Sequence, residues 1–132
     1  MEESEGGGLP LAPEPGTVIC ALDDIPDGGA REWTRGEGPD AYRLLLLRLD
    51  DEVFAYLNCC PHFSLPLNYE PQVFHVFDRE YLMCAHHTAL FHIRNGVCFD
   101  GPCAGARLRS VPVAVADRQV RIASAQNAGS QE

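Results

Sequence analysis

The amino-acid sequence predicts an all-β fold built from small antiparallel sheets. Short runs rich in Val, Ile, Leu, Phe and Tyr follow one another along the chain, and clusters of Gly, Pro, Asp and Asn separate nearly all of them. No apolar pattern with helical spacing extends beyond two turns. With 132 residues, the chain is long enough for one compact domain and too short for two.

Two of the predicted strands, Tyr42–Leu49 and Val53–Asn58, flank the pair Asp50-Asp51. Aspartates favour tight turns, so these two segments are expected to form a hairpin. The prolines between residues 59 and 83 predict a loop-rich insert, with at most one helical turn over Pro71–Asp78. The other predicted strands are Thr17–Ala21, Tyr81–Cys84, Val97–Phe99, Val111–Val115 and Gln119–Ile122.

The chain divides into a leader, one folded domain and a tail. Residues 1–16 are rich in Gly, Pro and Glu, a composition that buries too little apolar surface to fold, so a mobile leader is expected. Residues 17–122 contain every predicted strand and form the expected domain. Residues 123–132 are polar and predict a frayed tail.

Charge and composition exclude several classes of function. The formal net charge is -9 at pH 7, which disfavours binding to nucleic acid because phosphate contacts require clustered Lys or Arg. The longest aliphatic run, Leu44–Leu47, is far shorter than the roughly 20 residues that cross a bilayer, so no membrane partner is expected. The acidic start does not resemble a secretory signal, and we expect a cytoplasmic protein. Cytoplasmic cysteines indicate metal ligation or buried thiols rather than disulfides.

Two short motifs each pair a thiol with an imidazole. Cys60 and His62 have the spacing C-x-H, and Cys84 and His87 have the spacing C-x-x-H. Two sulfurs and two nitrogens suit a 2Fe-2S centre in which two cysteines bind one iron and two histidines bind the other. Backbone N–H groups of both loops can also donate hydrogen bonds to the cluster sulfurs. These residues are therefore the candidate metal ligands.

Other cysteines and histidines lie close to the motifs but lack the matching spacing. Cys59 adjoins Cys60 and is expected to turn away from the metal, while His86 is expected to face solvent or to lie behind the ligands. The remaining residues of these types are interpreted as structural, with Cys98 and Cys103 as reduced thiols beside a turn. This last group consists of His75, His92, Cys20, Cys98 and Cys103.

The chain resembles the Rieske ferredoxin family over about residues 17–122. The family patterns N-x-C-P-H, C-x-x-H-G-A-x-F and G-x-x-x-x-G-P correspond to Asn58–His62, Cys84–Phe91 and Gly96–Pro102, except that Thr88 replaces a Gly. The resemblance implies the Rieske fold of small stacked antiparallel sheets, with two cluster-binding loops at one tip. It also implies one Rieske-type 2Fe-2S cluster as the cofactor.

The resemblance further implies a soluble electron carrier without a catalytic site of its own. Such a protein passes one electron from a flavin reductase to an oxygenase, and both redox partners dock at the cluster tip. One alternative is the small subunit of a nitrite reductase. Another is an interaction module in which the same four residues bind zinc. The expected contact rim consists of Phe63, Leu65, Thr88 and Leu90.

The sequence also predicts a low reduction potential. High-potential members of the resembled family join their ligand loops by a disulfide, but the matching positions here are Leu65 and His86. Those members also place Ser and Tyr hydroxyls near the sulfurs, where this chain has Ala89 and Phe91. Hydrogen bonds to sulfur stabilise the reduced state, so their absence predicts a midpoint of about -150 mV, the lower end of the Rieske range.

Overall fold

The computed structural model describes residues 12–37, 41–59, 67–68, 72–84, 89–101 and 104–123. In these residues the chain forms one short 3-10 turn, η2 (Leu22–Asp24), and a series of short strands. The strands are β1 (Val18–Ala21), β2 (Ala30–Arg35), β3 (Tyr42–Leu49), β4 (Glu52–Leu57), β5 (His75–Phe77), β6 (Tyr81–Met83), β7 (Leu90–His92), β8 (Cys98–Asp100), β9 (Val113–Ala116) and β10 (Gln119–Ile122).

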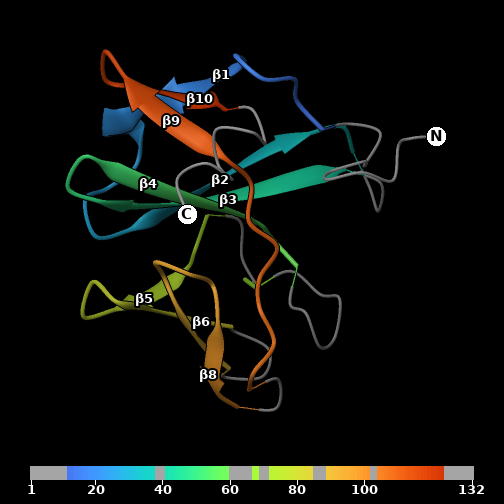
Figure 1. Ribbon diagram of the computed structural model, residues 1–132, viewed down its shortest axis with the longest axis vertical. Helices are drawn as coiled ribbons and strands as arrows, with labels where there is room; N and C mark the ends of the chain where they lie inside the picture. Colours follow the sequence, from blue (N-terminus) through green and yellow to red (C-terminus); the bar gives the residue numbers. More distant parts are fainter. Residues whose placement is uncertain are drawn as a thin grey trace.

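The strands form three antiparallel sheets, which confirms the all-β prediction. We call β1-β10-β9 the upper sheet, β2-β3-β4 the middle sheet and β5-β6-β7-β8 the lower sheet, as they lie in Figure 1. The upper and middle sheets are joined where the N–H of Val111 donates a hydrogen bond to the Ala55 carbonyl, 2.9 Å away. The lower sheet is connected to the middle sheet through the segment between β4 and β5.

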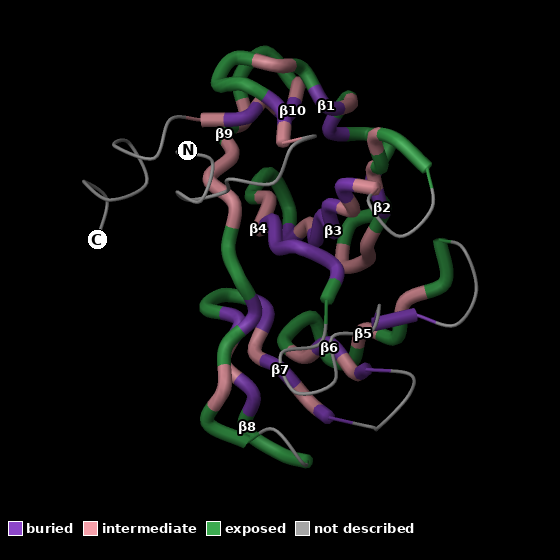
Figure 2. The backbone as a smooth tube through the Cα atoms, turned by 90° about the vertical axis from the view of Figure 1, so that its right-hand side faces the viewer, coloured by how far each residue is buried: buried purple, intermediate pink, exposed green. Residues whose placement is uncertain are grey.

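The middle sheet is buried on both faces, and two cores lie on its two sides. All four leucines of Leu44–Leu47 have an exposed fraction of 0%. Because successive side chains of a strand point to opposite faces, alternate leucines pack with Val120 of the upper sheet and with Phe91 of the lower sheet. Figure 2 shows the buried segments of β3 and β4 between the other two sheets. The continuous aliphatic run thus belongs to a strand covered on both sides.

The predicted hairpin is confirmed, and Leu49 pairs with Glu52 across the turn. The prediction of a helical turn over Pro71–Asp78 is wrong for residues 72–78, the part of this range that the structure describes. His75–Phe77 instead forms β5, which pairs antiparallel with β6. Asp78 and Arg79 both have φ of 55°, and two such residues in succession match the twist of a tight hairpin.

Three further strands, β2, β5 and β7, were not predicted from the sequence. β2 combines charged residues with Trp33 in no regular alternation, and its one buried residue, Glu32, bonds to polar partners from distant segments. β5 and β7 have three residues each and become regular only by pairing with β6. Most residues of the predicted leader and tail lie outside the described part, and their boundaries remain predictions. In the described part, no helix is long and apolar enough to span a membrane.

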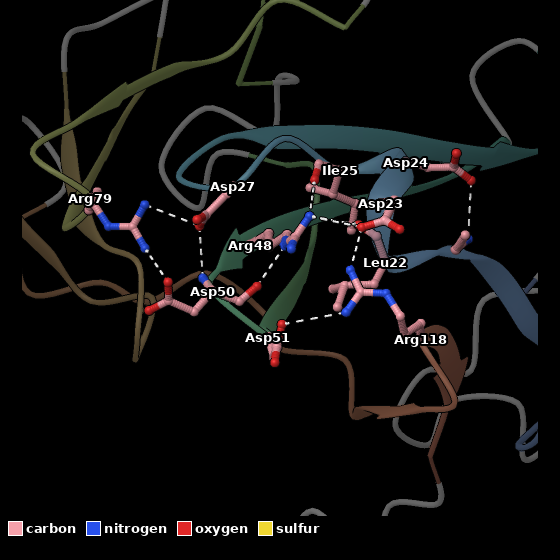
Figure 3. A network of polar contacts seen from close by, with 11 residues as sticks. Leu22, Asp23, Asp24, Ile25, Asp27, Arg48, Asp50, Asp51, Arg79 and Arg118 are labelled. Atoms are coloured by element: carbon pink, nitrogen blue, oxygen red, sulfur yellow. Dashed lines mark hydrogen bonds and ion pairs between the residues drawn. The ribbon is translucent and has the colours of Figure 1, made fainter.

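Ion pairs connect turns of all three sheets on one side of the molecule (Figure 3). Arg79, in the turn between β5 and β6, lies 3.1 Å from an Asp27 carboxylate oxygen and 3.3 Å from one of Asp50. Arg118, in the turn between β9 and β10, pairs with Asp23 of η2. These side chains are largely exposed, so solvent screens the attraction, and the pairs orient the turns more than they add to stability.

Candidate metal centre

The second motif begins directly after β6. Cys84 follows Met83, and its exposed fraction is 0%. Its N–H donates a hydrogen bond to the Ala89 carbonyl, 2.8 Å away, so residues 84 and 89 form the closed base of the loop 85–88. His87 and the other residues of that loop lie outside the described part of the chain.

Gly101 supports the base of this loop. Its φ is +108°, in the region that favours glycine, and a Cβ at this position would lie 2.7 Å from the Ala89 Cα. No real side chain tolerates that approach without movement of the backbone. Gly101 of the third sequence motif therefore has a physical role, which is to let the segment after β8 lie directly against Ala89.

The first motif begins directly after β4. Asn58 has an exposed fraction of 5%, and its side-chain oxygen accepts a hydrogen bond from the N–H of Leu67, 2.7 Å away. Its side-chain nitrogen donates to Asn68 Oδ1, at 2.9 Å. These bonds bring the two ends of the segment 59–66 together. Cys59 is exposed, whereas Cys60 and His62 lie outside the described part.

The pairing of the lower sheet places the second loop and the start of β5 at the same end of that sheet. β6 reaches this end at Met83, and β7 leaves it at Leu90, which pairs with Met83. The segment from the first motif enters the sheet at His75, which also pairs with Met83. Leu67 of the first loop base belongs to the same buried cluster as Cys84 and Ala89 of the second, so the two bases pack on one core. The assignment of the four ligands remains a prediction.

Several residues interpreted as structural have ordinary contacts in the lower sheet. His92 stacks on Phe99 with ring centroids 4.3 Å apart, and His75 is exposed. Cys98 is buried, and its Sγ lies 3.3 Å from the Asp100 carbonyl oxygen, while Cys103 is outside the described part. Cys20 is half-buried on β1, and burial is the main reason that its pKa is raised.

Sequence reasoning missed Glu32, Arg43 and Gln72, which surround the first loop base. Glu32 lies on β2 with an exposed fraction of 7%, and its carboxylate accepts hydrogen bonds from Arg43 and Asn58. The segment containing Glu32 alternates polar with apolar residues only weakly. The single available signal was an acidic residue beside Trp33 in a segment of strand length.

Cys84, the described member of the candidate ligands, fits an iron-sulfur cofactor. It supplies a thiol with an exposed fraction of 0% at a closed loop base, where water is excluded from the sulfur. The sequence places one Cys and one His on each of two loops, which is the donor set of a 2Fe-2S centre with mixed ligands. Ala89 and Phe91, at the hydroxyl positions of high-potential proteins, each have an exposed fraction of 0%.

Fold and loop bases together define a small β domain of three antiparallel sheets with two short loops closed at their bases. The model of the Rieske [2Fe-2S] domain family matches residues 16–117. The chain therefore belongs to the Rieske domain family, and one Rieske-type 2Fe-2S cluster is its cofactor. A comparison with curated proteins finds no match.

Solved structures with the same fold include ferredoxins of carbazole dioxygenases. The ferredoxin of carbazole 1,9a-dioxygenase from Nocardioides aromaticivorans IC177 is 23% identical, with a TM-score of 0.63 over 83% of this chain and 98% of that chain. A chain in a complex of reduced oxygenase and oxidized ferredoxin in carbazole 1,9a-dioxygenase is 24% identical, with a TM-score of 0.64 over 80% of this chain and 90% of that chain.

A longer chain with the same fold occurs in the reduced complex between oxygenase and ferredoxin in carbazole 1,9a-dioxygenase. The match covers 82% of the present chain and only 29% of that longer chain, at 18% identity and a TM-score of 0.66. At these identities the likeness shows the fold alone, and this fold is that of the Rieske domain.

Proposed function

We propose that this chain carries single electrons on a 2Fe-2S cluster held by Cys60, His62, Cys84 and His87. The observation that supports this proposal best is that both loop bases contribute to one buried cluster, in which Leu67 lies with Cys84 and Ala89. One base is closed by Asn58 and Leu67, and the other is closed by Cys84 and Ala89. When bound, the cluster accepts one electron and returns it, and the protein supplies the ligands, shields the sulfurs and orients the exposed edge.

The chain is proposed to have no catalytic site of its own and to serve as a component of an oxygenase system. It would receive its electron from a flavin reductase and deliver it to an oxygenase. The similar structures, whose names give ferredoxin and oxygenase together, support the second partner. A net charge of -9 favours partners with a basic docking face. We place the protein in the cytoplasm on the sequence argument, with neither nucleic acid nor a membrane as partner.

Docking is proposed at the cluster tip, on the rim formed by Phe63, Leu65, Thr88 and Leu90. Leu90 is the described member of this rim, and it is half-buried at the start of β7, beside the base of the second loop. Small apolar contacts suit a carrier that must dissociate after each transfer. The zinc-stapled module and the nitrite reductase subunit are weaker candidates, because the family match points to a redox cluster and all four ligands are present in the sequence.

The ligand assignment is tested on the purified full-length holoprotein. Single alanine variants at each of the four ligands are expected to lose bound iron, the visible absorption and the paramagnetic signal of the reduced cluster. Cys59→Ala and His86→Ala are the matched controls, since they change neighbouring residues of the same types, and both are expected to keep the cluster. A colourless wild-type protein with one bound zinc would contradict the proposal, as would an unchanged spectrum for Cys84→Ala.

A further inference from the structure

A partly buried ion pair contacts the first loop base. Glu32 on β2 accepts hydrogen bonds from Arg43 Nε at 2.6 Å and from Arg43 Nη2 at 3.1 Å. The Glu32 side chain has an exposed fraction of 5%, whereas that of Arg43 is 34%. Two parallel hydrogen bonds between one guanidinium and one carboxylate form the bidentate contact, which is stronger and more specific than a single hydrogen bond. Because the Glu32 carboxylate loses most of its hydration, the pair stabilises the fold less than its hydrogen bonds suggest, and its presence calls for another reason.

The ion pair sets the orientation of Asn58. Asn58 Nδ2 donates to Glu32 Oε2 at 2.8 Å and to Asn68 Oδ1 at 2.9 Å. Asn58 Oδ1 accepts from the N–H of Leu67 at 2.7 Å. A flipped amide would place its oxygen against the Glu32 carboxylate and its nitrogen against the N–H of Leu67. Glu32 therefore selects the one orientation of Asn58 that closes the loop.

Glu32 also contacts the chain that follows the first ligand loop, at Gln72. Its backbone N–H donates to Gln72 Oε1, and its carbonyl accepts from Gln72 Nε2, both at 2.9 Å. The Gln72 side chain thus bonds to the outer edge of β2 as a neighbouring strand would. Gln72 has a φ of 64°, an uncommon value for a residue other than glycine. A single residue of β2 therefore contacts the chain on both sides of the segment that contains Cys60 and His62.

We infer that the Glu32–Arg43 pair is a positioning element of the cluster site. It fixes the first ligand loop through Asn58, and it keeps the net charge next to that loop at zero. This inference rests on the proposed function. Asn58 is two residues from Cys60, and the chain cannot extend more than about 7 Å over that distance. The two opposite charges therefore lie close to the cluster ligands, yet they cancel one another. Breaking the pair from either side leaves one partly buried charge uncompensated.

The two ways of breaking the pair have opposite electrostatic signs. Glu32→Gln leaves the Arg43 cation, which stabilises the more negative reduced cluster, so the midpoint potential is expected to rise. Arg43→Gln leaves the Glu32 anion, which disfavours the reduced state, so the potential is expected to fall. The double variant removes both charges and is expected to return toward the wild-type value. Lost packing or a loosened loop would not produce shifts of opposite sign.

The experiment measures midpoint potentials of these holoprotein variants by protein-film voltammetry, together with the rate of iron loss to a chelator. The matched control is the exposed pair of Glu52 and Arg94, whose side chains lie 3.1 Å apart. Arg94 follows β7 at the opposite end of the lower sheet from the ligand loops. Glu52→Gln and Arg94→Gln are expected to leave the potential and the rate of iron loss unchanged, whereas Glu32→Gln and Arg43→Gln are expected to lose iron several-fold faster.

A conservative variant keeps the test decisive if Glu32→Gln does not fold. Arg43→Lys retains the positive charge and is expected to keep the wild-type potential, while Arg43→Gln lowers it. Equal potentials for wild type and Arg43→Gln would overturn the inference, as would shifts of the same sign in Glu32→Gln and Arg43→Gln. A wild-type protein without a 2Fe-2S spectrum would instead contradict the proposed function, so the two failures are distinguishable.

Discussion

The Tyr56 hydroxyl donates a hydrogen bond to the Ile93 carbonyl, 2.5 Å away, and so ties the middle sheet to the turn after β7. Tyr56 lies on β4 with an exposed fraction of 3%. The Cε1 atom of its ring lies 2.8 Å from where a Cβ at Gly96 would be, and Gly96 has a φ of +75°. A tyrosine in the middle sheet and a glycine before β8 are therefore fitted to each other, and this contact helps to place the lower sheet.

Tyr56→Phe is expected to destabilise the protein while leaving the aromatic ring in place. The substitution leaves the buried Ile93 carbonyl without its donor, and an unsatisfied buried acceptor costs about 1–3 kcal/mol. Urea unfolding of the holoprotein at neutral pH measures the difference. Tyr81→Phe, on the half-exposed face of the lower sheet, is the control and should change the free energy of unfolding less. Equal stability of wild type and Tyr56→Phe would show that the hydroxyl bond contributes nothing.

The same hydroxyl makes stability depend on alkaline pH. Burial raises the pKa of Tyr56 to about 12, partly opposed by Arg107, whereas an exposed tyrosine has a pKa near 10. Between these values the unfolded chain binds fewer protons than the folded chain, so the free energy of unfolding falls as pH rises. Complete ionisation of Tyr56 lowers the free energy of unfolding by on the order of 2–3 kcal/mol. In Tyr56→Phe the fall between pH 10 and 12 should be shallower, although Tyr42, whose pKa burial also raises, retains part of it. Parallel curves for the two proteins would contradict the assignment.

The sequence predicted the parts of the fold that local pattern controls. The run Leu44–Leu47 indicated a strand buried on both faces, and Asp50-Asp51 marked its turn. The pattern failed for β5, where prolines and a short length favoured a helical turn. That strand depends on pairing with β6 and on positive φ at Asp78 and Arg79, neither of which local composition reveals.

The candidate site was likewise predictable from the sequence only where local spacing controls it. The local C-x-x-H spacing made Cys84 a candidate ligand, an assignment that stays a prediction, and the structure places this residue at a closed loop base. Glu32 could not be predicted, because its environment comes from Asn58 and Gln72, which are 26 and 40 residues away in the chain. A charged residue in a short segment usually indicates an exposed strand face. Burial of Glu32 is explained by the partners that the fold brings to it.

Gly101→Ala is expected to disturb the second ligand loop. The new methyl group would approach the Ala89 Cα to 2.7 Å in a backbone conformation that disfavours side chains, and such strain costs about 1–3 kcal/mol. We expect a lower melting temperature and faster loss of iron to a chelator. Gly105→Ala is the matched control, because Gly105 also has a positive φ of +94° but no atom lies within 4 Å of the position that its new methyl group would take. Equal rates of iron loss in the two variants would show that contact with Ala89 does not support the loop.

Ala89→Ser is expected to raise the midpoint potential. Ala89 is fully buried, and its carbonyl accepts the hydrogen bond of the Cys84 N–H, so a hydroxyl at position 89 would lie at the base of the second ligand loop. A hydroxyl that donates to sulfur stabilises the reduced state and shifts the potential upward from an expected wild-type value of about -150 mV. Protein-film voltammetry at neutral pH measures both values, and Ala114→Ser on the exposed face of β9 is the control that should show no shift. A strongly positive wild-type midpoint would contradict the low-potential interpretation. An unchanged potential in Ala89→Ser would show instead that position 89 does not face a cluster or cysteine sulfur.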